Sequence, residues 1–299
     1  MDRRTLLKNA SLAALALGAG QLPAAVADQP KKRLLVFTRS QGFQHDCVKR
    51  KDGELSLAER IATELGGKLN IEVVCEKDGR CFLSKEFPTF DGFLFETQGN
   101  LGAEKSLDGA PPVPPEGKKA LLEAIEGGKG FVGCHCASDT YHSAGDAFET
   151  QNPTVRDPYI LMLGGEFIKH GKQQNATMRV VDRAFPGIKG QSDFKLYEEW
   201  YSLKNFAPDL HVILVQESKG MEGFEYKRPD FPATWARMHG KGRVFFTSMG
   251  HRDEVWKDSI FQTLLTGALS WTLGRVIADV SPNIDKVTPG ANDLPRRTK

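Results

Sequence analysis

The apolar positions of the chain fall into short β-rich runs that alternate with segments of helical spacing. The β-rich runs predict strands at residues 33–38, 71–75, 91–97, 131–132, 176–181, 211–216, 233–238 and 243–248. Helical spacing of apolar residues predicts helices at residues 55–65, 116–125 and 255–273, the first of them stopped by a Gly-Gly pair. Alternating strands and helices favour right-handed crossovers, so we expect one α/β domain with a mostly parallel central sheet covered on both faces.

One stretch combines a buried strand with a dense cluster of polar side chains. Residues 130–142 read GFVGCHCASDTYH, in which the apolar Phe131 and Val132 lead directly into cysteine, histidine, serine and aspartate. Ligands bind at the carboxyl ends of strands in open α/β sheets, so this cluster predicts a site at that edge. A strand end with a hydrogen-bonded loop is the alternative interpretation, and the stretch alone does not decide between the two.

Histidines follow three of the predicted strands. His45, His135 and His251 each lie in the polar segment after an apolar run. The carboxyl ends of parallel strands open on one edge, so we expect the three imidazoles to converge there. Histidine is the usual proton donor and acceptor near neutral pH and a common metal ligand. The alternative is that each imidazole is hydrogen-bonded locally in a structural role.

Metal binding and nucleophilic catalysis are both weaker interpretations of the same residues. His45, His135 and His251 are candidate metal ligands, but the sequence has neither a CxxC pair nor an HExxH motif. We therefore favour a site without a metal and leave the cofactor open. A nucleophile elbow would place His135 in the nucleophile position, with Cys134 and Cys136 one place off, so a cysteine hydrolase needs a shifted register.

The segment Glu198, Glu199, Trp200 and Tyr201 combines carboxylates with aromatic rings. Carboxylates bind sugar hydroxyl groups and aromatic rings pack on the apolar faces of sugars, so the segment suggests a carbohydrate ligand. A surface helix with an aromatic edge is the alternative.

The first 27 residues have the pattern of an export signal. Arg3 and Arg4 precede an apolar run that is shorter than the roughly 20 residues needed to span a bilayer. The run is followed by Ala25-Val26-Ala27, a small-x-small cleavage pattern. The arginine pair favours the twin-arginine route over an ordinary secretory signal. We therefore expect a signal peptide at 1–27, a folded domain at 28–275 and a loose tail at 276–299, with a periplasmic or secreted location.

Charge and cysteine usage exclude some partners. The chain of 299 residues has a formal net charge of +2, and removing residues 1–27 leaves the mature chain formally neutral. A nucleic-acid binder would carry a basic patch, so we expect no nucleic-acid partner. No further apolar segment reaches membrane length. Five cysteines leave at least one unpaired within the chain, although Cys75 and Cys81 could form a disulfide.

Several segments together resemble the ThuA-like, or trehalose-utilisation, family. They lie in the family's order from about residue 33 to 274: TRSQGFQHD (38–46), GFVGCHCASDTYH, GGEFIKH (164–170), YEEWY (197–201), FPATWARMHGKGRVFFTSMGH (231–251) and LLTGALSWTLG (264–274). The resemblance implies a flavodoxin-like, class I glutamine amidotransferase-like three-layer sandwich. It places His135 where the amidotransferases carry their cysteine, so glutaminase chemistry is not implied. The family is associated with sugar catabolism, including that of 3-keto disaccharides.

The chain departs from the family pattern at two places. Gly171 stands where the family often has proline, and the family commonly has small or aliphatic residues at the positions of Cys134 and Cys136. The resemblance therefore gives no support for a role of these two cysteines.

The leading hypothesis is a secreted enzyme that acts on a carbohydrate or keto-sugar by proton transfer, in an isomerisation, elimination or hydrolysis. His135 and His251 are expected to act as acid and base, oriented by Asp139 and Glu254, while His45 and Glu199 hold hydroxyl groups or a metal. Further candidate substrate-binding residues are Cys134, His142, His170, Trp200 and Tyr201. A non-catalytic carbohydrate-binding module and a cysteine-dependent amidase-like hydrolase remain as alternatives, and the oligomeric state is open.

Overall fold

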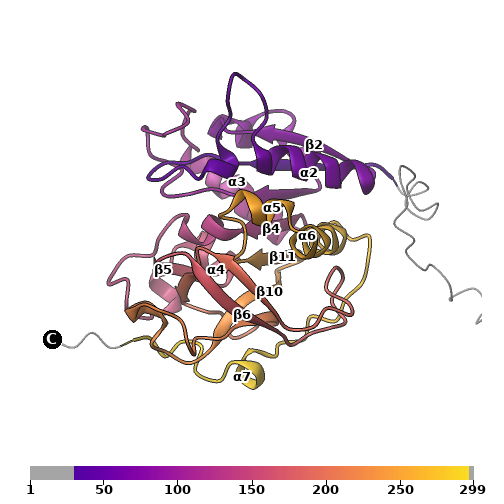
Figure 1. The fold of residues 1–299 in the computed structure, drawn as a ribbon. Helices are drawn as coiled ribbons and strands as arrows, with labels where there is room; N and C mark the ends of the chain where they lie inside the picture. Colours follow the sequence, from indigo (N-terminus) through magenta and orange to yellow (C-terminus); the bar gives the residue numbers. More distant parts are fainter. Residues whose placement is uncertain (1–29, 296–299) are drawn as a thin grey trace, which may run out of the picture.

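The computed structural model describes residues 30–295, and within them a nine-stranded mixed sheet carries helices on both faces (Figure 1). One half of the sheet is parallel and has the order β2 (Ile71–Glu76), β1 (Lys32–Phe37), β3 (Gly92–Phe95), β4 (Gly130–Cys134) and β11 (Gly242–Thr247). The other half is antiparallel and continues with β10 (Phe231–His239), β9 (His211–Gln216), β6 (Gln174–Val180) and β7 (Phe194–Glu198). A separate antiparallel pair consists of β5 (Glu166–His170) and β8 (Tyr201–Lys204).

The expected parallel arrangement of strands is therefore found in only one half of the sheet. The two-residue turn of Gly240 and Lys241 joins β10 to β11, and a turn this short can connect only antiparallel strands. Gly240 adopts a positive φ of 58°, which glycine reaches at little steric cost. The hydrophobic pattern predicts both strands but not the turn that sets their direction.

Both faces of the parallel half are buried, and strand β1 shows how. Leu34 and Val36 belong to the core on one face, whereas Leu35 and Phe37 belong to the core on the other, because successive strand side chains point to opposite sides. The first core is covered by α2 (Leu57–Lys68), α5 (Asp253–Lys257) and α6 (Ser259–Thr272) (Figure 1). The second is covered by α3 (Pro115–Glu126) and α4 (Pro158–Leu163).

Two predicted helix boundaries were wrong for identifiable reasons. The Gly-Gly pair lies inside α2, where a Cβ on Gly66 would come within 2.4 Å of Val73 Cγ2, so this glycine permits close helix–strand packing rather than ending the helix. The helix predicted at 255–273 is two helices, α5 and α6. It breaks at Asp258, whose carboxylate caps the backbone N–H groups of Ile260 and Phe261.

The segment after α6 is not the loose tail that we expected, as far as residue 295. It contains α7 (Ile284–Val287), and Ile284 is buried in the core. The side chain of Asn283 accepts from the N–H of Val212 at 2.7 Å and donates to its carbonyl at 3.0 Å, which attaches the segment to β9. The disulfide that Cys75 and Cys81 could have formed is absent: all five cysteines lie in the described part of the chain and are free.

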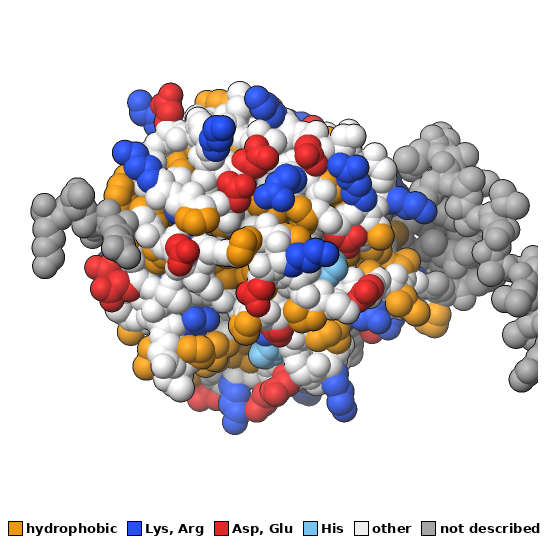
Figure 2. Space-filling model, turned by 90° about the horizontal axis from the view of Figure 1, so that it is seen from below, with side chains coloured by type: hydrophobic (Ala, Val, Ile, Leu, Met, Phe, Trp, Pro, Cys, Tyr) orange, Lys and Arg blue, Asp and Glu red, His pale blue; other side chains and the backbone are white. Residues whose placement is uncertain are grey.

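The remaining elements are short 3₁₀ helices: η1 (Asp46–Val48), η2 (Gly79–Leu83), η3 (Phe87–Thr89), η4 (His135–Asp139), η5 (Pro153–Val155) and η6 (Phe224–Tyr226). None of the helices within residues 30–295 combines the length and apolarity that crossing a bilayer requires. Acidic and basic side chains are interspersed over the face seen in Figure 2, in keeping with the near-neutral charge. The predicted signal peptide at 1–27 lies outside the described residues.

Candidate functional site

The structure brings the three strand-end histidines together at the carboxyl edge of the parallel strands. The ring centroids of His45 and His135 are 5.0 Å apart, those of His45 and His251 4.9 Å, and those of His135 and His251 5.3 Å. The loops after β1, β4 and β11 therefore open on one edge, as the parallel register requires. We call these three residues and Glu199 the histidine cluster.

The backbone at His135 turns sharply as β4 ends. His135 has a positive φ of 37°, a conformation that is uncommon for a residue with a Cβ and is concentrated at functional sites. Gly133 precedes it at a crowded point, where a Cβ would lie 3.1 Å from that of Ala137. The carbonyl of Ser248 lies 3.0 Å from His135 Nδ1 and can only accept, so Nδ1 carries a proton and Nε2 faces the cluster.

The loop that carries His251 is held at several points. Gly250 has a φ of 129°, which side-chain-bearing residues rarely adopt, and its N–H donates to Glu198 Oε2 at 3.1 Å. The N–H of His251 donates to the same oxygen at 3.2 Å. The indole N–H of Trp256 and the thiol of Cys47 both donate to the Gly250 carbonyl, at 2.7 and 3.4 Å. Because Cys47 follows His45 closely, these contacts fix two histidine loops relative to each other.

Glu199 supplies the carboxylate of the cluster from the two-residue connection between β7 and β8. Its Oε2 lies 3.5 Å from His135 Nε2 and 3.5 Å from His251 Nδ1. Its Oε1 lies 3.3 Å from His170 Nδ1, at the end of β5. Four histidines therefore surround or approach one half-buried carboxylate.

Burial and mutual repulsion set the charges of the cluster. Burial, followed by the neighbouring His135, lowers the pKa of His45 to about 2 and that of His251 to about 4, so both are neutral at pH 7. Burial also disfavours the charged form of His135, but Glu199 and two further carboxylates outweigh it and raise the pKa of His135. Burial would raise the pKa of Glu199, yet His135 and the other imidazoles lower it.

Two buried carboxyl groups lie behind the cluster. Burial raises the pKa of Glu96 to about 8 and also raises the pKa of Glu198, so Glu96 is mostly protonated at pH 7. The thiol of Cys136 donates to Glu96 Oε1 at 3.2 Å, while Glu96 Oε2 is buried and has no hydrogen-bond partner. Both carboxyl groups are buried, so any negative charge that they carry acts on His135 with little screening by water.

The described residues contain two sets of side chains that could hold a metal ion. One ligand atom from each of His45, His135, His251 and Glu199 lies within 4.8 Å of the others. The second set combines His45 with Glu96 and Cys136.

Neither Cys134 nor Cys136 has the properties of a reactive cysteine. Burial raises the pKa of both thiols well above the usual range, whereas an activated thiolate has a lowered pKa.

Aromatic rings line the approach to the cluster. The ring of Tyr201 lies 4.0 Å from that of His135, and Phe167 lies 4.1 Å from Tyr201. Phe43 packs edge-on to His45 at 4.9 Å and is 56% exposed. The cluster therefore has an apolar rim as well as a polar centre.

Asp139 and His142 form a different group from the one that we expected. His142 Nε2 lies 2.5 Å from Asp139 Oδ1, and His142 Nδ1 lies 3.3 Å from Glu166 Oε1. Gln98 donates to the other oxygen of Asp139 at 2.8 Å, and Asn205 donates to Glu166 at 2.6 Å. Asp139 thus orients His142, and the carboxylate that faces His135 and His251 is Glu199.

Three further predicted site residues are not brought to the cluster. Glu254 has an exposed side chain on α5 and pairs with Arg252 at 3.0 Å. Trp200 is fully buried and donates its indole N–H to the carbonyl of Gln174 at 3.0 Å, so it offers no face to a ligand. Cys134 is buried in the core on the face of α2 and α6. The surface helix considered for this aromatic segment does not form, because Glu198 ends β7 and Tyr201 begins β8.

Sequence reasoning missed several members of the site. Glu96 follows the apolar residues of β3 directly, so the rule applied to the other three strand ends would have found it. Gln173, whose amide nitrogen lies 2.9 Å from His251 Nε2, comes from an irregular connection that carries no pattern. Ser248 acts through its backbone carbonyl, which the identity of a residue does not reveal.

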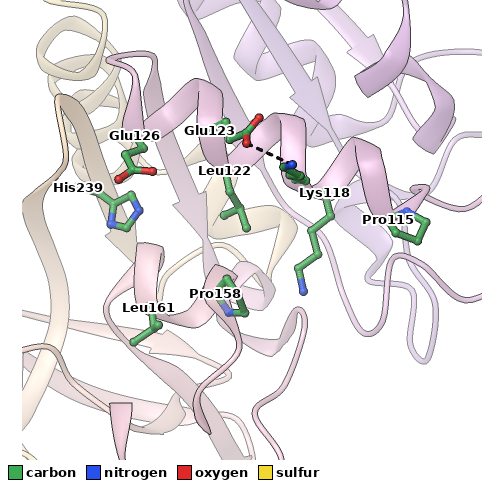
Figure 3. A pocket seen from close by; sticks show the side chains of 9 residues that line it. Pro115, Lys118, Leu122, Glu123, Glu126, Pro158, Leu161 and His239 are labelled. Atoms are coloured by element: carbon green, nitrogen blue, oxygen red, sulfur yellow. Dashed lines mark ion pairs between the residues drawn. The ribbon is translucent and has the colours of Figure 1, made fainter. Parts of the chain in front are cut away.

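Two surface hollows lie away from the cluster. One of about 480 Å³ lies between α3 and α4 and is lined by His239 (Figure 3). His239 pairs with Gly242 at the start of β11, so this hollow lies at the edge of the sheet opposite the histidine cluster. Lys119 and Glu123 form an ion pair of 3.8 Å on its rim (Figure 3). The other, of about 440 Å³, reaches Tyr141 and His142. Neither includes a residue of the cluster.

Comparison with known proteins identifies the family. Residues 33–272 match the ThuA family, described as trehalose utilisation. The chain belongs to the ThuA family. A ThuA-like protein from Bacteroides uniformis ATCC 8492 shares the fold of this ThuA protein with a TM-score of 0.59 at 18% identity, covering 84% of this chain and 95% of that one. A second, from Parabacteroides merdae ATCC 43184, gives a TM-score of 0.55 at 17% identity, covering 90% and 98%. No curated protein matches the chain.

Proposed function

We propose that this ThuA protein is an enzyme of carbohydrate catabolism that moves protons on a sugar or keto-sugar at the histidine cluster. The observation that carries the proposal is the meeting of three imidazoles and one carboxylate from four separate segments of the chain. Structural histidines would each need only a local partner, whereas these share a centre. The family description supplies the substrate class, and the exposed ring of Phe43 beside His45 suits the apolar face of a sugar.

The chemistry that fits is proton transfer next to a carbonyl. A base removes the proton from the carbon beside the keto group, and an acid protonates the oxygen, which gives an enediol. Return of a proton to the former carbonyl carbon, while the hydroxyl group on the deprotonated carbon loses its proton to the base, gives an isomer. Loss of a leaving group from the carbon on the other side of the deprotonated carbon gives an elimination product. His135 and His251 provide the acid and base, and Glu199 orients both, in the place first expected of Asp139 and Glu254.

Exchange of carbon-bound hydrogen in heavy water tests the proposal. The mature protein is incubated with trehalose and with its 3-keto derivative, and NMR follows deuterium incorporation and product formation. We expect exchange and turnover of the keto-sugar, and a loss of at least about 100-fold in His135→Ala and His251→Ala, the usual scale of general acid–base catalysis. Glu254→Ala, on the exposed face of α5, serves as the matched control and retains activity.

Sugar binding without exchange or turnover would overturn the enzymatic proposal and favour the carbohydrate-binding module instead. Inactivation by alkylation of Cys134 or Cys136, with the histidine variants still active, would favour the cysteine hydrolase. The buried thiols argue against this outcome.

We also propose that the protein is exported through the twin-arginine route, on the strength of Arg3, Arg4 and the Ala25-Val26-Ala27 pattern. A further proposal is that the parallel half of the sheet is flavodoxin-like. Its order β2-β1-β3-β4-β11 supports this, because flavodoxin-like sheets have the order 2-1-3-4-5. A crystal structure in which β11 does not follow β4 would contradict it.

A further inference from the structure

We propose that His45, His135, His251 and Glu199 bind one divalent transition-metal ion of the Zn²⁺ type. This inference rests on the proposed function and deepens it by naming a cofactor for the same site, at which His135 and His251 bind the ion instead of acting as acid and base. It rests on the spacing of the ligand atoms, on their lack of other partners, on the groups that orient the rings and on the chemistry of the donor set.

The spacing fits ligands around one ion better than a network of hydrogen bonds. His135 Nε2 and His251 Nδ1 each lie 3.5 Å from Glu199 Oε2. Donor–acceptor distances in N–H···O hydrogen bonds are usually about 2.7–3.2 Å. Four ligands on a tetrahedral ion with bonds of about 2.0–2.1 Å lie about 3.4 Å from one another. These two distances match the ligand spacing that such an ion requires, and all four ligand atoms lie within 4.8 Å of one another.

One ring nitrogen of each cluster histidine has no hydrogen-bond partner. His45 Nδ1, His135 Nε2 and His251 Nδ1 are buried and make no hydrogen bond. His45 is 2% exposed and His135 is fully buried, so bulk water has little access to form hydrogen bonds with them. A buried polar atom left unpaired costs about 1–3 kcal/mol, and three such atoms at one point are hard to explain by chance. A shared cation would satisfy all three at once.

The surroundings of His135 orient the ring as a metal ligand requires. The carbonyl of Ser248 accepts from its Nδ1–H at 3.0 Å, which leaves Nε2 as the nitrogen that faces Glu199. Metal-bound histidines usually donate their other N–H to a carbonyl or carboxylate in this way. The fixed turn at His135 holds the ring in that orientation.

The surroundings of His251 set a condition on metal binding. Gln173 presents its amide nitrogen to His251 Nε2 at 2.9 Å, and its amide oxygen accepts from Arg252. Ligation through Nδ1 requires a proton on Nε2, which then needs an acceptor. The amide of Gln173 must therefore turn its oxygen toward the ring when the ion binds. A carboxylate at this position would accept from the ring and from Arg252 together, so Gln173→Glu should strengthen binding.

The donor set selects the class of ion and its chemistry. Three imidazoles and one carboxylate suit Zn²⁺ and neighbouring first-row metals, whereas Mg²⁺ and Ca²⁺ prefer oxygen ligands. Such an ion would act as a Lewis acid that polarises a carbonyl oxygen of the substrate. Proton transfer would then fall to groups at the rim, of which His170 is 3.3 Å from the other oxygen of Glu199.

Metal content and Co²⁺ titration test the inference on the exported, full mature protein. We expect one metal ion per chain by elemental analysis after purification without chelator. After removal of the metal with a chelator, Co²⁺ should bind with one-to-one stoichiometry and give the visible absorption of a four- or five-coordinate site. Glu199→Gln and His135→Ala should weaken Co²⁺ binding at least about 100-fold, and Gln173→Glu should strengthen it about 10-fold, the scale at which such orienting groups act.

Two comparisons make the result decisive. His239→Ala removes a histidine beside the hollow at the opposite edge and should leave Co²⁺ binding unchanged, and circular dichroism reports whether each variant is folded.

Folded wild-type protein that binds no Co²⁺, or binding that survives Glu199→Gln unchanged, overturns the inference. Full turnover of the keto-sugar by chelator-treated protein also overturns it while leaving the proposed function intact. Stoichiometric binding without exchange or turnover overturns the proposed function and leaves the metal site standing.

Discussion

Glu198 accepts a hydrogen bond from the backbone N–H of His251 at 3.2 Å, although 52 residues separate the two. The same oxygen accepts from the N–H of Gly250 at 3.1 Å. Glu199, the next residue, directs its carboxylate at the ring of His251. One pair of adjacent glutamates therefore holds both the backbone and the side chain of a cluster histidine, and the two have separate tasks.

Replacing Glu198 should destabilise the fold. In Glu198→Ala, the N–H groups of Gly250, His251 and Glu199 lose their acceptor, and each N–H left unpaired in a buried position costs about 1–3 kcal/mol. We therefore expect the free energy of unfolding to fall by about 2–4 kcal/mol, measured by urea denaturation. Glu198→Gln keeps one acceptor oxygen, so its free energy of unfolding should fall by less than half as much as that of Glu198→Ala. Glu254 is exposed, so the free energy of unfolding of Glu254→Ala should stay within about 0.5 kcal/mol of the wild-type value. Equal stability of Glu198→Ala and the wild type would show that the loop is held elsewhere.

Removing the exposed ring of Phe43 should weaken substrate binding. The ring lies edge-on to His45 at 4.9 Å and is 56% exposed, so it can pack against a ligand in the cluster. An aromatic contact of about 1 kcal/mol corresponds to roughly a fivefold rise in KM, and we expect kcat to change little in Phe43→Ala. Val155→Ala, which removes another exposed apolar side chain, is the control. A fall in kcat with unchanged KM would assign Phe43 to the reaction instead.

The placement of the three histidines followed from sequence because it depends on a general rule. Parallel strands open their carboxyl ends on one edge, so locating β1, β4 and β11 was enough to bring His45, His135 and His251 together. The direction of β10 depended on the turn at Gly240 and Lys241, which hydrophobic periodicity does not report. The sequence therefore predicted the parallel half of the sheet better than the antiparallel half.

The rest of the site depends on contacts between side chains from distant segments. Asp139 was expected to orient the acid and base because it is close in sequence to His135, yet it binds His142. Trp200 and Glu199 are neighbours in sequence, but the strand connection sends one into the core and the other to the cluster. Which of two adjacent residues reaches a site is decided by tertiary packing, and a single sequence holds no record of it.

Export predicts a defined mature N-terminus. Cleavage after Ala27 would leave Asp28 as the first residue, which mass spectrometry of the native protein can establish. Replacing both Arg3 and Arg4 with lysine should abolish transport by the twin-arginine route and leave uncleaved precursor in the cytosol. The single change Lys8→Arg, outside the pair, should leave export intact. Wild-type protein with an intact Met1 in the cytosolic fraction would contradict the prediction.

The ion pairs of His142 should make stability depend on pH at the alkaline side. Burial disfavours its charged form, but Asp139 and Glu166 outweigh burial and raise the pKa of His142 from 6.5 to about 9. A pKa raised by folding stabilises the protein fully below the unfolded value, near 6.5, and the stabilisation is lost as pH rises through about 9. The free energy of unfolding of the wild type should therefore exceed that of His142→Asn by a constant amount below pH 6. This difference should shrink between about pH 6.5 and 9.

Urea denaturation at pH 6, 7.5 and 9.5 measures this difference, and NMR titration of the His142 ring gives its pKa directly. His239 is the control, because burial lowers its pKa and it is neutral throughout the alkaline range. The difference in free energy of unfolding between the wild type and His239→Asn should accordingly not change from pH 7.5 to 9.5. The side chain of His142 is 43% exposed, so solvent screening should keep the pH-dependent part small. A wild-type advantage over His142→Asn that does not change with pH would mean that the imidazole is neutral in the folded protein.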